Sequence, residues 1–182
     1  RELREDPDAA THIGVGVAVC VAPSSSTRMG SYNAGYYTAR MRMDSGGRVH
    51  VYPEGSDMGQ SHETTIAKIV SGALGVDESD VQMTQGDTEA CPYGSGSSSS
   101  RFSVVGTSAC YEAAAELAQK VRAIVAHNQN DEPENIVLEG GEARATGSGA
   151  TMTLKAVANT AYQRIHDLPE GMEPGLELTH YY

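Results

Sequence analysis

Two hydrophobic periodicities follow one another in the first half of the chain, and their order constrains the fold more than any other feature. Apolar and polar residues alternate in YYTARMRMD (36–44) and again in RVHVYPEG (48–55), with the turn sequence Ser-Gly-Gly between them. Alternation around a short glycine turn is typical of a β-hairpin with one buried face. The residues predicted to form that face are Tyr37, Ala39, Met41, Met43, Val49 and Val51.

At Ser61 the spacing of apolar residues lengthens from two to between three and four. This spacing predicts an amphipathic helix, with Ser61 as its N-cap, Glu63 in its first turn and Gly75 at its end. The apolar residues that share one face are Ile66, Ile69, Val70, Ala73 and Leu74.

A second, longer helix is predicted to run to about His127. Its apolar stripe is Val104, Ala113, Leu117, Val121, Ile124 and Val125. A third helix is predicted for TLKAVANTAYQR (153–164), with Thr153 as its N-cap.

Short strands account for most of the remaining patterns. DVQMTQ (80–85) predicts one strand, and IVLEG (136–140) and ARATG (143–147) predict two more, joined through Gly140-Gly141-Glu142. IGVGVAVCVA (13–22) is a β-branched apolar run that predicts a buried strand. A polar, turn-rich segment follows it at 23–35, and the tail 167–182 is rich in Pro and Gly and is expected to be extended.

The predicted fold class is therefore α+β. A β-hairpin and short strands pack with two main helices, in a single domain over residues 1–182. A chain of this length buries about 70% of its unfolded surface, which is enough for one core.

The charge balance excludes some classes of partner. The net charge is -11, from 24 acidic and 13 basic residues, so the phosphates of nucleic acids would be repelled. No apolar run reaches the roughly 20 residues that cross a bilayer, and the charged N-terminus lacks the apolar core of a signal peptide. We expect a cytoplasmic protein with neither a nucleic-acid nor a membrane partner.

Lysine is scarce, with only Lys68, Lys120 and Lys155 in the chain. An acidic, lysine-poor surface suggests a salt-rich, halophilic cytoplasm, where ions screen self-repulsion. An ordinary acidic protein from a mesophile is the equal alternative. The three cysteines form no CxxC pair, so neither a disulfide framework nor a zinc site is indicated.

Small polar residues and glycine precede both main helices. MGQSHET opens the first helix, and CPYGSGSSSSRFS (91–103) leads into the second. A helix N-terminus carries unpaired N–H groups and partial positive charge, which favour a phosphate. The hydroxyls of the serine run and the guanidinium of Arg101 add further donors, so the two helix starts together suit an elongated anion. On composition alone, a solvated linker is the better explanation of the serine run.

Several other common binding and catalytic motifs are absent, because one required residue is missing from each. The serine run lacks the lysine of a P-loop, and GVGVAV (14–19) has Val where a dinucleotide fingerprint needs its third glycine. An HExxH zinc site would need a histidine where Ile66 stands, and no GxSxG nucleophile elbow occurs around Ser95.

Two longer motifs, in order, resemble the molybdenum-hydroxylase family: the large subunits of carbon monoxide dehydrogenases, aldehyde oxidases and xanthine dehydrogenases. GQSHET (59–64) resembles the family's GQGHET-type motif at the start of a helix. GDT (86–88), PYG (92–94) and Ser100-Arg101 resemble its second segment before another helix. The likeness covers most of the chain, from the hairpin to the C-terminal GMEPGLELTHYY.

The resemblance implies a pocket for a molybdopterin cofactor, in its cytosine dinucleotide form with molybdenum. It places one group of residues near the pterin or phosphates and a second group on the other side, with Ser99 near the metal. These residues are Gly59, Gln60 and Ser61 in the first group, and Ser97, Ser98, Ser99, Ser100 and Arg101 in the second. His62, which follows the first group, is by its residue type a candidate donor to a phosphate, and a solvated histidine in the first helical turn is the equal alternative. Ser61 replaces the family's usual glycine, and the serine run replaces a more varied sequence.

The resemblance also implies that catalysis needs more than this chain. The family's general-base glutamate lies in a GxGE segment that does not occur after Thr179, so we expect no catalytic residue and no metal ligand here. We expect a fragment of the C-terminal molybdopterin-binding half, inactive and without cofactor when alone. Its partners would be the rest of the large subunit and the iron–sulfur and flavin subunits or domains. The parent enzyme would oxidise CO, an aldehyde or a heterocycle. The alternative is a non-catalytic subunit-contact module that retains no cofactor.

Overall fold

A computed structural model describes residues 8, 10, 11, 13–20 and 35–182. The predicted turn-rich segment lies outside these residues, except for Gly35.

The central feature is a four-stranded sheet with the strand order β3-β2-β1-β7. β1 (Thr38–Met43) and β2 (Val49–Pro53) form the predicted antiparallel hairpin, with Met41 opposite Val51. β3 (Val81–Met83) runs parallel to β2. β7 (Glu177–Tyr181) lies antiparallel to β1 on the other side and is the outermost strand of the part described.

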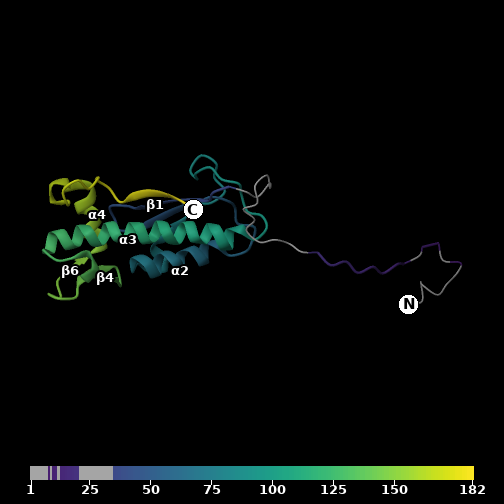
Figure 1. Cartoon of the computed structure of the whole chain (residues 1–182), viewed down its shortest axis with the longest axis horizontal. Helices are drawn as coiled ribbons and strands as arrows, with labels where there is room; N and C mark the ends of the chain where they lie inside the picture. The colour runs from purple at the N-terminus through teal and green to yellow at the C-terminus, as the bar shows by residue number, and fades with distance from the viewer. Residues whose placement is uncertain (1–7, 9, 12, 21–34) are drawn as a thin grey trace.

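The predicted hairpin face is confirmed as the floor of the core. Tyr37, Ala39, Met41, Met43, Val49 and Val51 are all fully buried. Helices α2 (His62–Leu74) and α3 (Thr107–Gln129) lie side by side and pack over this face (Figure 1). Among the described residues, no helix is both long and apolar enough to cross a membrane.

A smaller sheet stands at the far end of the helices, with the order β4-β5-β6. Its strands are β4 (Ile136–Glu139), β5 (Glu142–Ala145) and β6 (Thr151–Thr153). α4 (Leu154–Gln163) follows, and the hydroxyl of Thr153 accepts a hydrogen bond from the N–H of Ala156, as predicted for its N-cap. Single turns of 3₁₀-helix join several elements: η1 (Glu78–Asp80), η3 (Pro133–Asn135) and η4 (Ile165–Asp167).

The two sheets meet where α2 ends. Gly75 is left-handed (φ 68°), as predicted for a helix stop, and its carbonyl accepts a hydrogen bond of 2.7 Å from the N–H of Gly141. A Cβ at Gly75 would lie 2.5 Å from backbone atoms of Leu138 and Glu139. Only glycine therefore allows the smaller sheet to approach α2 so closely.

The start of the long helix differs from the prediction. A π-helical turn, η2 (Phe102–Gly106), precedes α3, and the side chain of Val104 is 47% exposed rather than part of the buried stripe. A π turn inserts an extra residue and rotates the helix face. Phe102 and Gly106 become the buried residues of this turn.

The prediction of a buried strand at 13–22 is wrong for residues 13–20, and 21–22 lie outside the described residues. Residues 13–20 belong to no strand and run away from the packed elements (Figure 1), with Val17 and Val19 each 93% exposed. The strand beside β1 is β7, from the tail that was predicted only to be extended.

Candidate functional site

The two predicted helix starts meet at one hollow of about 370 Å³. One wall comes from the segment that opens α2, including Gln60, His62 and Thr65. The opposite wall comes from the serine run and the first turns towards α3, over 97–103 together with Thr107. The structure therefore brings both sequence motifs to the same place, with hydroxyl groups on both sides.

The N-terminus of α2 is capped by a residue that the sequence analysis did not identify. One carboxylate oxygen of Asp57 accepts N–H bonds from Gly59 (2.6 Å) and Gln60 (3.1 Å), and the other accepts from His62 (2.8 Å). These bonds lower the pKa of Asp57. Ser61 stands at the N-cap position in a left-handed conformation (φ 62°) but makes no capping bond, so the predicted cap is wrong. The sequence analysis did not identify Asp57 because the residue lies five positions before His62, and it reaches the helix start only because residues 58–61 fold back.

This cap changes how α2 can bind an anion. The backbone amides of Gly59, Gln60 and His62 already donate to the chain's own carboxylate. A phosphate at this helix start would compete with Asp57. On the α2 side, the hollow is therefore lined by the side chains of Gln60 and Thr65 rather than by these amides. Both side chains also bond within the chain: Gln60 Nε2 donates to the carbonyl of Ser56 (3.3 Å), and Thr65 Oγ1 donates to that of Ser61 (3.0 Å).

His62 is held inside the protein rather than presented to solvent. Its side chain is buried, and its Nδ1 lies 3.1 Å from Oε1 of Gln85. The imidazole stacks on the ring of Phe102, with centroids 3.4 Å apart and planes 12° apart. The stack joins the start of α2 to the start of the π turn, so His62 fixes the distance between the two walls.

The four serines divide into a structural one and a group at the hollow. Ser97 Oγ donates to the carbonyl of Ser56 (2.9 Å) and accepts from its N–H (3.1 Å), which fastens the serine run to the end of the hairpin. Ser98, Ser99 and Ser100 continue along the hollow, and Ser99 and Ser100 are exposed. Both have positive φ, 47° and 54°, which non-glycine residues rarely adopt.

Arg101 ends the serine run with its side chain only 2% exposed. Its guanidinium donates to the carbonyl of Gly35 (3.2 Å) and lies 5.6 Å from the ring centre of Tyr37. Arg101 lines the hollow, but these contacts tie its head group to the protein body.

Glu54 is a further residue that sequence reasoning missed. It follows β2 directly, its side chain is buried, and its carboxylate accepts N–H bonds from Ser95 and Gly96. Burial raises the pKa of Glu54, against the opposing effect of these bonds and of Arg101. A carboxylate directly after a buried strand was the available signal.

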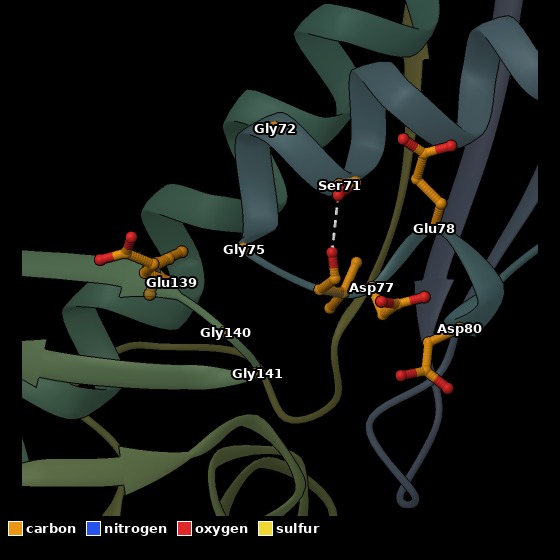
Figure 2. Close-up of a pocket in the computed structure, with 11 residues that line it drawn as sticks. Ser71, Gly72, Gly75, Asp77, Glu78, Asp80, Glu139, Gly140 and Gly141 are labelled. Atoms are coloured by element: carbon orange, nitrogen blue, oxygen red, sulfur yellow. Dashed lines mark hydrogen bonds between the residues drawn. The ribbon is translucent and has the colours of Figure 1, made fainter.

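A second hollow, of about 780 Å³, lies where α2 meets the smaller sheet (Figure 2). Asp77, Glu78, Asp80 and Glu139 line it, and their carboxylates point in different directions. Asp77 caps η1 through the N–H of Ser79 (2.9 Å). Over the described part of the chain, no three His, Cys, Asp or Glu side chains could hold a metal ion together. Four carboxylates would repel an anionic ligand, so this hollow does not compete with the serine-lined one.

A family of known proteins matches the whole chain. The family model described as molybdopterin cofactor-binding domain matches residues 1–182. The chain belongs to this family. Membership in the molybdopterin cofactor-binding domain family favours a cofactor role over a subunit-contact module.

The curated relatives include the large subunits of two enzymes. The chain is 31% identical over 194 residues to the carbon monoxide dehydrogenase large chain of Hydrogenophaga pseudoflava, covering 98% of this chain and 22% of the relative. It is 32% identical over 185 residues to the nicotine 6-hydroxylase large subunit of Paenarthrobacter nicotinovorans, covering 98% of this chain and 23% of that subunit. The molybdopterin-binding chain described here thus spans less than a quarter of either relative's length.

Solved structures place the fold in the same family. Quinoline 2-oxidoreductase from Pseudomonas putida 86 matches with a TM-score of 0.75 and 33% identity, over 82% of this chain and 19% of that one. Carbon monoxide dehydrogenase from Oligotropha carboxidovorans matches with a TM-score of 0.72 and 30% identity, over 80% of this chain and 18% of that one. The mixed α and β arrangement expected from the sequence is confirmed.

Proposed function

We propose that the hollow between the start of α2 and the serine run is this chain's part of a molybdopterin-binding pocket. The observation that carries the proposal is the convergence of Gln60 and Thr65 with Ser98, Ser99 and Ser100 on a single hollow of about 370 Å³. That volume is in the range of small-molecule sites. Hydroxyl and amide groups suit the ring nitrogens of a pterin and its phosphate oxygens.

The proposal divides the sequence-predicted residues by role. Ser98, Ser99 and Ser100 would contact the cofactor through their hydroxyls, because they continue along the hollow from the serine that is fastened to the hairpin. The amide of Gln60 would contribute the hydrogen of Nε2 that its bond to the carbonyl of Ser56 does not use. Ser97, His62 and Arg101 would hold the walls, because each is bonded or stacked within the protein. Gly59 and Ser61 would set the path of the loop, since both have positive φ.

We further propose the cytosine dinucleotide form of the cofactor, with molybdenum, in the full enzyme. When bound, the cofactor supplies the redox chemistry, and this chain supplies orientation and hydrogen-bond donors. The parent would oxidise CO, an aldehyde or a heterocycle in the cytoplasm. The rest of the large subunit and the iron–sulfur and flavin subunits would be its partners.

The test replaces Ser98 with Leu in the full-length subunit expressed with its partners, followed by assay of molybdenum and of the nucleotide released by acid. Ser98 is chosen because, unlike Ser99 and Ser100, it does not have positive φ. We expect at least a tenfold loss of both, because the side chain fills the hollow and removes a donor. Ser45→Leu, in the exposed turn at the other end of the hairpin, is the matched control and should retain the cofactor. Full cofactor content in Ser98→Leu would overturn the proposal.

A further inference from the structure

The carboxyl group of Glu54 lies inside the protein at the base of the serine run. The residue is 2% exposed. Oε1 accepts hydrogen bonds from two consecutive backbone amides, Ser95 and Gly96, the second at 3.1 Å. Oε2 is buried and, within the described structure, has no hydrogen-bond partner. Because one oxygen of this buried carboxylate accepts both amide hydrogens, the carboxylate anchors the loop that contains Ser95 and Gly96.

Gly94 shows how closely the loop fits this carboxyl group. A Cβ at Gly94 would lie 1.5 Å from Cδ of Glu54 and 2.0 Å from Oε2. The backbone of Gly94 therefore lies close against the carboxyl group, and no residue larger than glycine fits there. Glu54 and Gly94 together determine where the loop enters the serine run.

The main chain of Glu54 links the same point to the opposite wall of the hollow. Its carbonyl accepts hydrogen bonds from the hydroxyl of Tyr37 and from Nε2 of Gln85 (3.0 Å). Gln85 then bonds to His62, which stacks on Phe102. Glu54 is thus connected to both walls of the hollow. Its carboxylate bonds to the loop that leads into the serine run, and its carbonyl bonds to Gln85, which bonds to His62 at the start of α2.

The groups that face Glu54 are few. The guanidinium of Arg101 favours the ionised carboxyl, and the phenol of Tyr37 is buried beside it. Asp87 and Cys91 line the adjacent hollow that Glu54 also lines. Burial outweighs the favourable contacts and raises the pKa of Glu54.

We infer that Glu54 is a positioning residue, whose buried carboxyl fixes residues 94–96 and so places the hydroxyls of Ser98, Ser99 and Ser100 at the pocket. Its importance for the cofactor rests on the function proposed above. Its action on the loop does not, and it can be measured without cofactor.

The sign of the pH effect follows from linkage. A raised pKa means that the closed loop binds a proton more tightly than an open loop does. Opening therefore becomes easier as the pH rises from the ordinary glutamate value of about 4.3 through the raised one. Replacement of Glu54 by Gln keeps an oxygen acceptor for both amides and removes the titration.

The experiment uses the full-length subunit with its partners, isolated from a host that cannot make molybdopterin. Amide hydrogen exchange is followed in the peptide 92–101 as a function of pH, with intrinsic rates divided out. In Glu54→Ala we expect about a tenfold rise in exchange at Ser95 and Gly96, because both amides lose their acceptor. In Glu54→Gln we expect the amides of Ser95 and Gly96 to be protected from exchange almost as in the wild type, and their exchange to be independent of pH once intrinsic rates are divided out. Glu89→Gln, exposed in the preceding turn, is the control and should keep the normal profile.

The outcomes separate the two ideas. Unchanged exchange in Glu54→Ala, or a normal pH profile in Glu54→Gln, overturns the inference whether or not the subunit binds cofactor. If Glu54→Ala does not fold, the profile of Glu54→Gln decides alone. When the same subunits are made in a host with the cofactor, we expect content to fall about tenfold in Glu54→Ala and to recover in Glu54→Gln. Unchanged exchange would refute Glu54 as the anchor, whereas a wild-type subunit that holds no cofactor would refute the proposed function.

Discussion

The ring of Phe102 lies flat against the imidazole of His62, so the first residue of the π turn is stacked on the first residue of α2. The two segments are far apart in the sequence, and each opens one of the two main helices. The stack therefore sets the width of the serine-lined hollow, and it gives a direct test of the site's architecture.

Replacement of Phe102 by Ala should destabilise the protein by about 3–5 kcal/mol, because it removes a buried aromatic ring and leaves a cavity. Denaturant unfolding of the full-length subunit, followed by circular dichroism, measures the effect. Val104→Ala, two residues away and 47% exposed, should change stability by less than about 0.5 kcal/mol. Equal effects of the two changes would contradict the stacked arrangement.

Replacement of Gly75 by Ala should cost at least about 2 kcal/mol. The left-handed backbone contributes about 1–2 kcal/mol, and the clash with backbone atoms of Leu138 and Glu139 adds to it. Gly140→Ala is the matched control, because Gly140 is also left-handed (φ 59°) but a Cβ added there would meet no atom within 4 Å. Gly140→Ala should lower the free energy of unfolding only by the cost of the left-handed backbone, about 1–2 kcal/mol. Denaturant unfolding compares Gly75→Ala with Gly140→Ala.

Asp57 should make the stability of α2 depend on pH in the acid range. Its pKa is lowered in the folded state by its bonds to Gly59, His62 and Gln60. The stability it contributes is therefore present above the unfolded value of about 3.9 and is lost as the pH falls through the lowered one. Melting temperature against pH should show this loss in the wild type and a shallower one in Asp57→Asn. An identical slope in Asp57→Asn would refute the capping role.

The acidic surface should make stability depend on salt. With a net charge of -11, self-repulsion is screened as ionic strength rises. We expect the melting temperature to rise between low salt and molar KCl, and to rise less in sucrose of equal osmolality. A melting temperature independent of KCl would leave an ordinary acidic protein as the explanation.

The parts of the fold that the sequence predicted are those with a strong local period. The hairpin face from Tyr37 to Val51, helix α2 and the Gly75 stop follow from alternation, helical spacing and a glycine. Each depends on contacts within a few residues or on a single buried face, so the pattern is visible in the sequence.

The errors arose where the local spacing of apolar residues did not decide the outcome. Residues 13–20 have a strand pattern but pair with no described strand, and a strand forms only where a partner is present. Val104 has the right spacing for the stripe of α3, but the π turn rotates it outward. The spacing of apolar residues predicts which face of a helix a residue lies on only where the helical repeat is not interrupted, for example by a π turn.

The candidate site divides in the same way. The sequence indicated the serine run and the start of α2 by their residue types, and both line the hollow. It did not indicate Asp57, Glu54 or Phe102, because their roles depend on how loops fold back onto the helix starts. Those three residues supply the bonds and the stacking that shape the hollow.

The outer edge of β7 has a practical consequence. Leu176 and Tyr182 bond to β1, so the strand's alternation directs the amide and carbonyl groups of Glu177, Thr179 and Tyr181 the other way. No strand of the described residues pairs with this row, and such a row of backbone groups accepts a further strand, including one from another molecule. Purified by itself, the polypeptide should thus self-associate as its concentration rises, and solubility screens should begin with dilute samples.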